Sequence, residues 1–367
     1  MQNKVFSVIP YYGGKAKMNS LIVDLLDYQN TDIYIEPFGG GARTLLNKPR
    51  HRYEVMNDLS TGIQALFTTL TDRTATRQLM NFLYETEYSK KWFEWAVAYR
   101  NEIEDNAVGE IKRQMVDYIN QIEDRYNLDL WGEFRKFSSD IYVEKTLRKL
   151  DISPEERKKA VTLVNKYFSI KSHEKLSDLT VSDALSKQGY DKIHHAAATF
   201  IVYQMSRDSM GRYFTAYRFK SENAYYNTID RLMEANDRLS GVQIYAKDAM
   251  EFFNDGEDAV LNDNRVMLYC DPTYLSEEDV DTYIKLKEDY NPGAVYKNYW
   301  TYTEHEEFLK KIQYAECKIL LSNYRDRTHL YDRYLNSSTG WRSIEYETVT
   351  TVGVGAKKRT EVMWLNY

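Results

Sequence analysis

Four consecutive residues, Asp271-Pro272-Thr273-Tyr274, combine groups that can hold an amine together with the ring that carries it. They follow an apolar run at 265–270, whose length and β-branched or aromatic residues predict a buried strand. Open α/β sheets place their active sites where such strands end. There the Asp271 carboxylate and the Pro272 carbonyl can each accept one N–H of an exocyclic amine, while the Tyr274 ring stacks on the base.

This combination suits an amine that is a poor nucleophile. The amino nitrogen of adenine delocalises its lone pair into the ring, and two acceptors that draw the nitrogen towards tetrahedral geometry localise that pair and direct it at an electrophile. The alternative interpretation is a strand followed by an ordinary turn, because Asp and Pro are both common in turns. For an isolated motif this short we would favour the turn, so the interpretation depends on the rest of the chain.

Composition and length bound the protein class. The chain has 367 residues, enough for a large core and for two domains or one domain with a large insertion. Hydrophobic residues make up 43% and charged residues 28%, values typical of a globular protein rather than a disordered or membrane chain. The start of the chain lacks the pattern of a secretory signal, and no stretch has the ~20 apolar residues of a membrane span. We expect no membrane association.

Charge and cysteine content add two expectations. The formal net charge of −6 disfavours indiscriminate nucleic-acid binding but leaves room for a local basic face. The two cysteines, Cys270 and Cys317, lie in predicted buried strands, where they are interpreted as core residues rather than as a disulfide. This pattern predicts a reducing, cytoplasmic location.

A second region predicts a nucleoside site. A strand is predicted at 33–36, followed by the glycine-rich stretch 37–42 and then a helix, which is where a Rossmann-like sheet receives an adenosine-containing cofactor. A further predicted strand at 53–57 ends at Asp58. This acid lies 19 residues beyond Gly39, about the ~20-residue offset at which an acidic side chain meets ribose hydroxyls.

The same stretch favours S-adenosylmethionine over NAD as the cofactor. The third glycine of a dinucleotide fingerprint would fall at position 44, which is Thr44. Without that glycine no pyrophosphate cradle is expected. The six histidines show no metal-ligand spacing, so we expect no metal site.

Between these regions, a basic and aromatic segment at 205–220 is predicted to form a loop or hairpin. Its Arg207, Arg212 and Arg218, interleaved with tyrosine and phenylalanine, suit contacts to phosphates and base edges. The polar, tyrosine-rich stretch from Tyr274 to about Thr303 is long enough for a mobile lid. Hydrophobic periodicity predicts the remaining elements, which are helices at 18–26 and 305–314 and strands at 242–246, 318–321, 341–349 and 361–367.

In this order the motifs resemble those of the DNA adenine methylase type of DNA adenine-N6 methyltransferases, over nearly the whole chain. The residues that carry the resemblance are YYGGK at 11–15, EPFGGGA at 36–42, ND at 57–58, GRYF at 211–214, YAKDA at 245–249, YCDPTY at 269–274, LLSNY at 320–324 and the closing EVMWLNY. The resemblance implies an α/β fold: a Rossmann-like methyltransferase sheet with an inserted, mainly helical target-recognition domain. The catalytic domain would comprise 1–69 and 240–367, and the recognition domain 70–239.

The resemblance also implies an activity, partners and residue roles. The chain would transfer a methyl group from S-adenosylmethionine to N6 of an adenine flipped out of duplex DNA, with Arg207, Arg212 and Arg218 contacting the DNA. A cognate restriction endonuclease is a further partner that this family admits. Asp271, Pro272 and Tyr274 would hold the target base. The implied cofactor-binding residues are Tyr11, Lys15, Pro37, Phe38, Gly39, Gly41, Asp58, Leu59 and Asp248.

Three residues depart from the family pattern. Thr273 stands where a second proline is usual, Tyr11 where an indole is common, and Thr215 where an asparagine follows the phenylalanine. Because the accepting carbonyl belongs to Pro272, we expect the chemistry to survive with a less rigid loop. The alternatives are a methyltransferase for cytosine N4, RNA adenine or protein glutamine, and a non-catalytic DNA-binding relic of the fold; Asp271 favours adenine.

Overall fold

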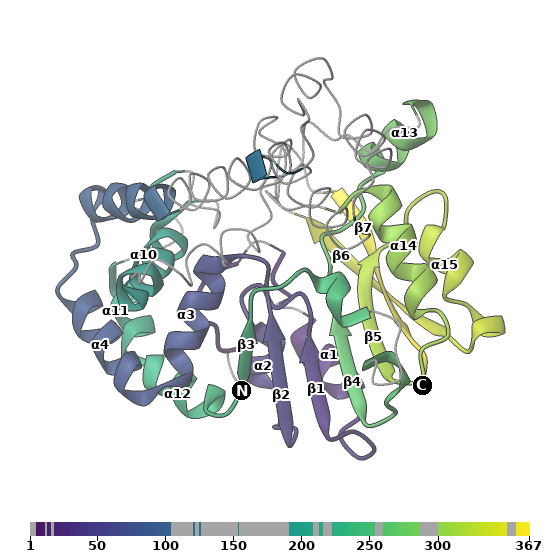
Figure 1. Cartoon of the computed structure of the whole chain (residues 1–367), viewed down its shortest axis with the longest axis horizontal. Coiled ribbons are helices and arrows are strands. Elements are labelled where there is room, and N and C mark those ends of the chain that lie inside the picture. The colour runs from purple at the N-terminus through teal and green to yellow at the C-terminus, as the bar shows by residue number, and fades with distance from the viewer. Residues whose placement is uncertain are drawn as a thin grey trace. The chain divides into compact units, whose positions relative to one another are not determined.

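The computed structural model describes residues 5–11, 13–15, 18–103, 120–121, 125, 153, 191–207, 213–215, 222–253, 260–286, 300–350 and 357–367. Within them the chain is a mixed α/β fold built on a seven-stranded sheet (Figure 1). One compact unit, Met1–Val97 with Lys192–Tyr367, contains this sheet, and a second unit spans Ala98–Asp191. Most of the second unit falls outside the described residues. The predicted recognition region at 70–239 therefore stays a prediction.

The sheet has the strand order β3-β2-β1-β4-β5-β7-β6. The first five strands in this order are parallel, while β7 runs antiparallel to both β5 and β6. All seven predicted strands are confirmed. Strand β5 is longer than predicted, because it continues through Ser322, Asn323 and Tyr324. Their bounds are β1 Ile33–Glu36, β2 Tyr53–Asn57, β3 Gln243–Tyr245, β4 Val266–Cys270, β5 Lys318–Tyr324, β6 Arg342–Thr350 and β7 Lys357–Leu365.

This order contains the point at which an open α/β sheet binds ligands. From β1 the chain proceeds to β2 on one side, and from β4 it proceeds to β5 on the other. The order 3-2-1-4-5 is shared with dinucleotide-binding sheets, whose ligands lie outside the carboxyl ends of the strands where the direction of winding reverses. Here the direction of winding reverses between β1 and β4. The predicted glycine turn and the Asp271 motif follow these two strands directly.

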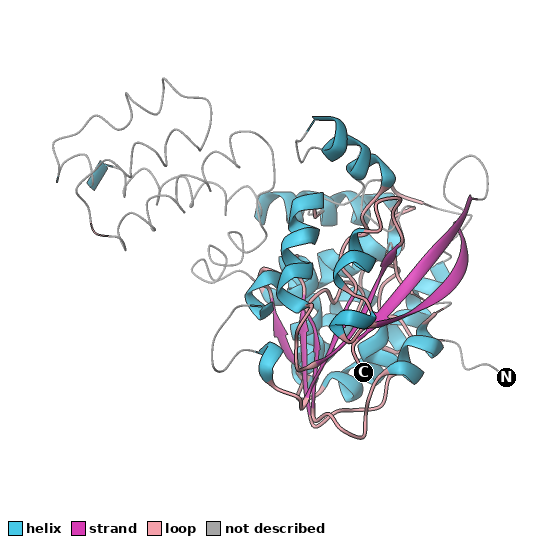
Figure 2. Ribbon diagram, turned by 90° about the vertical axis from the view of Figure 1, so that its right-hand side faces the viewer, coloured by secondary structure: helices cyan, strands magenta, loops and turns pink. Residues whose placement is uncertain are grey.

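Helices lie on both faces of the sheet (Figures 1 and 2). The predicted helices at 18–26 and 305–314 are confirmed as α1 and α14, and a capping box formed by Thr301 and Glu304 starts α14. The described helices are α1 Asn19–Leu25, α2 Arg43–Asn47, α3 Thr61–Thr71, α4 Arg73–Tyr84, α10 Lys192–Met205, α11 Glu222–Asp230, α12 Leu232–Leu239, α13 Glu277–Leu286, α14 Tyr302–Ile312 and α15 Leu330–Tyr334, with short 3-10 turns at Ala249–Phe253, Val260–Asn262 and Ser337–Thr339.

Helix α13 occupies part of the segment predicted as a lid. The Ser276 hydroxyl accepts a hydrogen bond from the Asp279 N–H at 3.1 Å, and the Asp279 carboxylate accepts one from the Ser276 N–H at 3.0 Å. These reciprocal bonds satisfy backbone donors that a helix start leaves open. The sequence analysis predicted no helix at 277–286, and the predicted lid stays a prediction because residues 287–299 lie outside the described part of the chain.

Alternation along the strands gives the sheet one apolar face and one mixed face. Successive strand side chains point to opposite faces, and on the apolar face Ile35, Leu268 and Leu321 pack against Phe308 of α14 and Tyr331 of α15. On the other face the positions near the strand ends are polar: Glu36, Tyr269, Ser322 and Glu361. Both cysteines are free and buried. The mixed face is the one that continues into the Asp271 motif.

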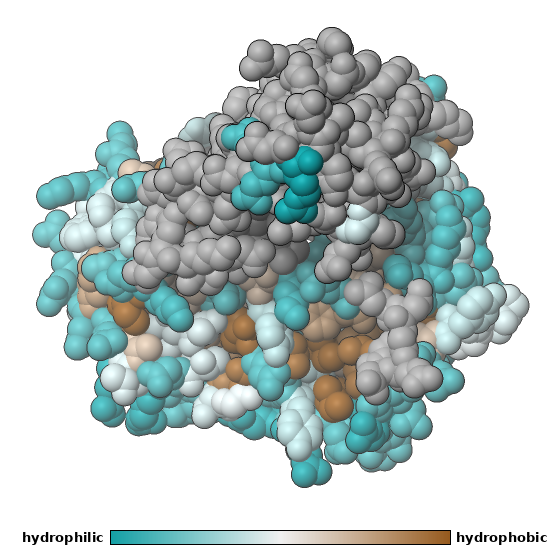
Figure 3. All heavy atoms as spheres, viewed as in Figure 1, coloured by the Kyte–Doolittle hydropathy of each residue, from teal (hydrophilic) through white to brown (hydrophobic). Residues whose placement is uncertain are grey.

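The described surface in Figure 3 is mostly hydrophilic, with apolar side chains visible between the polar ones. Among the described helices, none combines the length and the apolar character that crossing a membrane requires.

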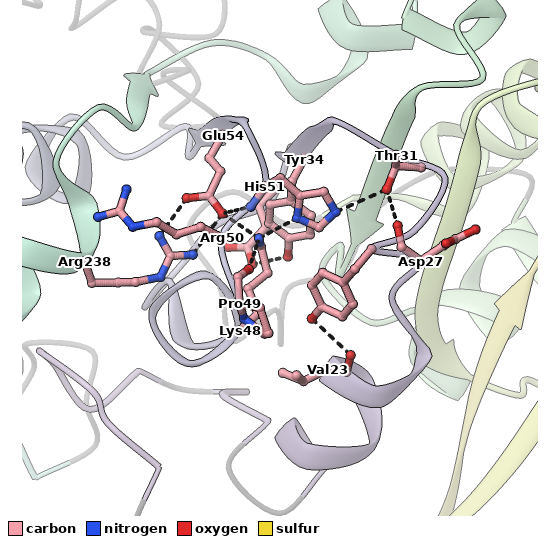
Figure 4. Close-up of polar contacts among 12 residues, drawn as sticks. Val23, Asp27, Thr31, Tyr34, Lys48, Pro49, Arg50, His51, Glu54 and Arg238 are labelled. Atoms are coloured by element: carbon pink, nitrogen blue, oxygen red, sulfur yellow. Dashed lines mark hydrogen bonds and ion pairs between the residues drawn. The ribbon is translucent and has the colours of Figure 1, made fainter.

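A buried polar cluster lies near the amino-terminal ends of β1 and β2 (Figure 4). The Lys48 ammonium donates to the Glu54 carboxylate at 2.5 Å, to His51 Nδ1 at 2.8 Å and to the Pro49 carbonyl at 2.9 Å. Arg238 of α12 holds the same carboxylate with two hydrogen bonds, at 2.6 and 2.9 Å. Burial and the nearby Lys48 charge lower the pKa of His51 to about 4, so His51 is neutral at pH 7. The three N–H donors of Lys48 thus all have partners.

Candidate active site at the carboxyl edge of the sheet

Asp271 lies at the carboxyl end of β4, beside the neighbouring strand β5. The register pairs Cys270 with Leu321, which places Asp271 next to Ser322. The Ser322 hydroxyl donates to Asp271 Oδ1 at 2.8 Å, and the Lys15 ammonium lies 2.9 Å from the same oxygen. Both contacts are made to Oδ1, so neither occupies Oδ2. These two contacts hold the carboxylate in one orientation and leave Oδ2 out of both.

Tyr274 forms the second part of the site. Its ring meets that of Tyr324 edge-on, with 4.5 Å between ring centres, and its hydroxyl lies 3.4 Å from the Glu361 carboxylate. The Lys15 ammonium lies over the Tyr274 ring, 4.2 Å from its centre. Burial and the nearby Asp271 charge raise the pKa of Tyr274 well above its usual range, so the phenol stays protonated and donates to Glu361. These contacts fix the Tyr274 ring beside Asp271.

Glu361 is a second carboxylate of the site that sequence reasoning missed. It lies on β7 opposite Tyr324 and is buried. Burial raises the pKa of Glu361 above its usual value, the Lys15 charge opposes this, and the Asp271 charge adds to it. The available signal was a charged residue opening the otherwise apolar run Val362–Leu365. A carboxylate in such a strand requires a polar partner, which Tyr274 provides.

Thr273, the departure from the family pattern, has its own contact. Its hydroxyl accepts a hydrogen bond from the Trp300 N–H at 2.8 Å, a role that proline could not fill. The Trp300 ring in turn meets Phe38 of the glycine turn edge-on, with 4.9 Å between ring centres. Thr273 therefore links the Asp271 loop, through Trp300, to the turn after β1. The predicted loss of loop rigidity is offset by this hydrogen bond.

The glycine turn after β1 packs closely enough that side chains would not fit. A Cβ on Gly39 would lie 2.6 Å from the Met56 side chain, and one on Gly41 would lie 2.9 Å from Tyr11. Gly40 has a positive φ of 49°, a backbone conformation that glycine adopts without strain. Its N–H donates to Asp58 Oδ2 at 2.8 Å. The structure thus brings Gly39, Gly41, Tyr11 and Asp58 together.

Asp58 and its neighbour Asn57 order the loops around this turn. Asp58 Oδ1 accepts from the Ser60 N–H at 2.8 Å, and burial raises the pKa of Asp58 against the lowering effect of its two N–H donors. The Asn57 amide donates to the carbonyls of Pro37 and Lys247, at 2.9 and 3.0 Å, and accepts from the Lys247 N–H at 2.8 Å. Asn57, fully buried, therefore ties together the loops after β1, β2 and β3. The sequence singled out the pair but gave Asn57 no role.

The remaining predicted cofactor residues lie around these loops. Asp248 is exposed, and its carboxylate accepts from the Met250 N–H at 2.9 Å at the start of a 3-10 turn. Leu59 and Phe38 are half-buried, Phe38 between the rings of Trp300 and Phe253. Lys15, expected to contact the cofactor, lies against Asp271.

Of the three predicted DNA-binding arginines, only Arg207 is described. It is exposed, and its N–H donates to the Tyr213 carbonyl at 2.7 Å, while Ser206 and Phe214 form an antiparallel bridge. Ser206 and Arg207 are therefore paired with Tyr213 and Phe214 inside the predicted segment. Arg212 and Arg218 lie outside the described residues.

The residues of the glycine turn fit an adenosine-containing cofactor with a positively charged sulfur. The turn offers close-packed backbone where the winding of the sheet reverses between β1 and β4, and Asp58 supplies a carboxylate at the ribose offset. Among the described residues, no group of three or more His, Cys, Asp or Glu side chains is arranged to hold a metal ion. No model of a known protein family matches the chain, and no curated protein shows significant similarity to it.

Proposed function

We propose that this protein is an S-adenosylmethionine-dependent DNA adenine-N6 methyltransferase. The observation that carries the proposal is the position of Asp271 and Tyr274 at the end of β4, next to the glycine turn at the end of β1. These are the two strands between which an open α/β sheet of this order binds its ligands. An acceptor for an amine and a site for an adenosine-containing donor are thus adjacent.

The residues divide into two groups by role. The backbone of Pro37, Gly39 and Gly41, with Phe38, Leu59 and Asp248, would hold the cofactor, and Asp58 would bind its ribose. Asp271 and the Pro272 carbonyl would accept the two N–H bonds of the target amine, and Tyr274 would stack on the base. When bound, the cofactor would supply an electrophilic methyl group with a sulfide as its leaving group, and Asp271 and the Pro272 carbonyl would direct the lone pair of adenine N6 towards it.

Most of the acceleration would come from positioning. Ser322 of β5 fixes the Asp271 carboxylate by a hydrogen bond. Tyr324 and Glu361 fix the Tyr274 ring by an edge-on ring contact and by a contact to its hydroxyl. Two reactants fixed in this way lose little further freedom on reaching the transition state. After transfer, the methylated nitrogen releases its proton to solvent, and Asp271 remains a hydrogen-bond acceptor throughout. The target base can reach Asp271 only after it has flipped out of the DNA duplex.

Nucleoside analysis of cellular DNA tests this function. The chain is expressed in cells that lack adenine methylation, and the DNA is digested and examined by mass spectrometry. We expect N6-methyladenine in these cells and none in cells that express the Asp271→Ala variant at equal level. Methylation-sensitive sequencing of the same DNA gives the recognition site. N4-methylcytosine in place of N6-methyladenine, or no methylated base at all, would overturn the proposal.

A further inference from the structure

The Lys15 ammonium lies where the proposed function places the amino group of the target base. It is 2.9 Å from Asp271 Oδ1 and 4.2 Å from the centre of the Tyr274 ring, the two groups assigned to the flipped adenine. We propose that Lys15 occupies the base site of the free enzyme and that the target amine enters by displacing its ammonium. This inference rests on the proposed function and assigns Lys15 a role beyond a cofactor contact.

Two contacts of Lys15 are with the groups assigned to the target base, the Asp271 carboxylate and the Tyr274 ring, and a third is with its own loop. One N–H is directed to a carboxylate, another to the Gly13 carbonyl at 2.9 Å, and the charge lies over an aromatic face. The pair is largely shielded from water, with the Lys15 and Asp271 side chains 10% and 21% exposed. An ammonium in this place satisfies an acceptor and a ring face that would otherwise meet solvent.

Lys15 and the target base exclude one another. A base stacked on Tyr274 lies at van der Waals distance, about 3.5 Å, and so fills the layer in which the ammonium sits. Charge adds a second reason: the amine nitrogen becomes positive as the methyl group is transferred, and an ammonium that stayed beside Asp271 would oppose that change. The reactive complex therefore requires Lys15 to leave, while Ser322 keeps Asp271 in position.

The surrounding residues give Lys15 an alternative partner. The Glu361 carboxylate is close enough for the Lys15 charge to lower its pKa, and Glu361 bonds the Tyr274 hydroxyl rather than its ring. Lys15 follows two exposed glycines, of which Gly13 has a positive φ of 79°. A short backbone adjustment can therefore carry the ammonium from the ring face of Tyr274 towards Glu361.

The same loop connects the base site to the cofactor site. Tyr11, four positions before Lys15, packs on the glycine turn so closely that a Cβ on Gly40 would lie 2.8 Å from its ring. A ligand that approaches the backbone of this turn meets Tyr11, and a ligand at Asp271 meets Lys15. We therefore expect cofactor and base to bind with positive coupling, which linkage requires to be reciprocal.

A double-mutant cycle tests the contact without any reference to methylation. Urea unfolding is measured for the wild type, Lys15→Met, Asp271→Asn and the double variant. Lys310→Met serves as a control, because the Lys310 side chain in its ion pair with Glu306 is 53% exposed. We expect the two single substitutions to be non-additive by about threefold or more in the unfolding constant. Additive effects would overturn the inference at its first step.

Base entry is then measured with a duplex that carries 2-aminopurine at the methylated position of the protein's own site. Fluorescence titrations are made with and without S-adenosylhomocysteine. We expect S-adenosylhomocysteine to strengthen duplex binding by the wild type and by Lys310→Met. Lys15→Met should bind the duplex about fivefold more tightly than wild type in its absence, with little further gain on adding it.

The outcomes separate the inference from the proposed function. Weaker duplex binding by Lys15→Met, or an undiminished gain from S-adenosylhomocysteine, overturns the inference alone. A wild-type protein that neither flips a base nor methylates DNA overturns the proposed function and the inference with it.

Discussion

Two lysine–carboxylate pairs at opposite ends of the parallel strands differ in burial and in the number of their hydrogen-bond partners. In Lys48–Glu54 the side chains are 0% and 3% exposed, whereas in Lys15–Asp271 they are 10% and 21% exposed. Glu54 receives two further hydrogen bonds from Arg238, and the ammonium of Lys48 has three partners (Figure 4). Asp271 receives one from Ser322, on the oxygen that Lys15 also contacts.

The difference distinguishes an ion pair that stabilises the fold, Lys48–Glu54, from one whose cation another donor can replace, Lys15–Asp271. A fully partnered buried cluster is costly to break, because removal of one member leaves the others uncompensated. In the Asp271 pair, Ser322 keeps the carboxylate partnered when the cation leaves, and no contact among the described residues uses the second carboxylate oxygen, so another donor can replace the cation. We therefore expect substitutions in the Lys48 cluster to lower stability, and substitutions around Asp271 to lower activity in a protein that remains folded.

The largest expected loss of stability comes from Glu54→Gln. The variant leaves the Lys48 and Arg238 charges buried with only an amide between them, and a loss of about 3–5 kcal/mol in the free energy of unfolding follows. Urea unfolding measures it. The control is Glu306→Gln, whose exposed partner Lys310 should make the change smaller than about 0.5 kcal/mol. A Glu54→Gln loss as small as that of the control would contradict the distinction drawn between the two pairs.

Glu36→Gln should change how stability depends on pH. Burial raises the pKa of Glu36 to about 7, so the folded protein holds a proton there that the unfolded chain releases near pH 4.5. This group therefore lowers stability as pH rises from about 4.5 to about 7. Glutamine can still accept from the Tyr34 hydroxyl and lacks that titration.

Relative to wild type, the Glu36→Gln variant should gain up to about 3 kcal/mol across this pH window. The lowered pKa of His51 has the opposite effect: it makes the free energy of unfolding rise with pH between about pH 4 and 6.5. Because His51 is present in both proteins, its contribution cancels in the comparison. Unfolding midpoints in urea at pH 5, 6 and 7 measure the difference. A constant offset between variant and wild type would show that Glu36 does not titrate in this range.

Ser322→Ala should separate orientation from stability at the active site. The hydroxyl donates to Asp271 Oδ1 at 2.8 Å, and its loss frees the carboxylate to rotate. We expect kcat to fall about tenfold, equivalent to about 1.4 kcal/mol, with KM for the cofactor unchanged. The conservative Ser322→Thr variant keeps a hydroxyl and should recover part of the rate. A fall in stability with normal kcat would instead give Ser322 a purely structural role.

The smallest expected effect is that of Thr273→Val. The valine keeps the shape of threonine but cannot accept the Trp300 N–H, so a hydrogen bond worth about 1 kcal/mol is lost. We expect a modest fall in the free energy of unfolding and little change in kcat, since the Pro272 carbonyl is retained. Thr228→Val, on the exposed side of α11, serves as a matched control. Equal losses in the two variants would show that the Trp300 contact contributes nothing specific.

Local sequence signals predicted the parts of the molecule that depend on short-range order. All seven strands and the placement of Asp271 after β4 followed from apolar runs and from the rule that sites lie at strand ends. Helix α13 was missed, although Ser276 and Asp279 carried a cap signal, because its polar composition suggested a loop.

Contacts between distant residues were beyond sequence reasoning. Lys15 and Asp271 are 256 positions apart in numbering (271 − 15), and their pairing depends on how the amino-terminal loop packs on the finished sheet. The roles of Glu361 and Asn57 were overlooked for the same reason. Tyr274, the partner of Glu361, and Pro37 and Lys247, the partners of Asn57, become neighbours only when the strands assemble.

The central claim is that Asp271 holds and directs an adenine amine beside a methyl donor. Transfer of tritiated methyl groups from S-adenosylmethionine to duplex DNA tests it most directly, with wild type and Asp271→Asn compared at equal cofactor occupancy established by calorimetry. We expect the wild type to label the DNA on adenine N6 and Asp271→Asn to be slower by at least about 100-fold while it binds the cofactor normally. Equal rates for the two proteins, or labelling of neither DNA sample, would contradict it.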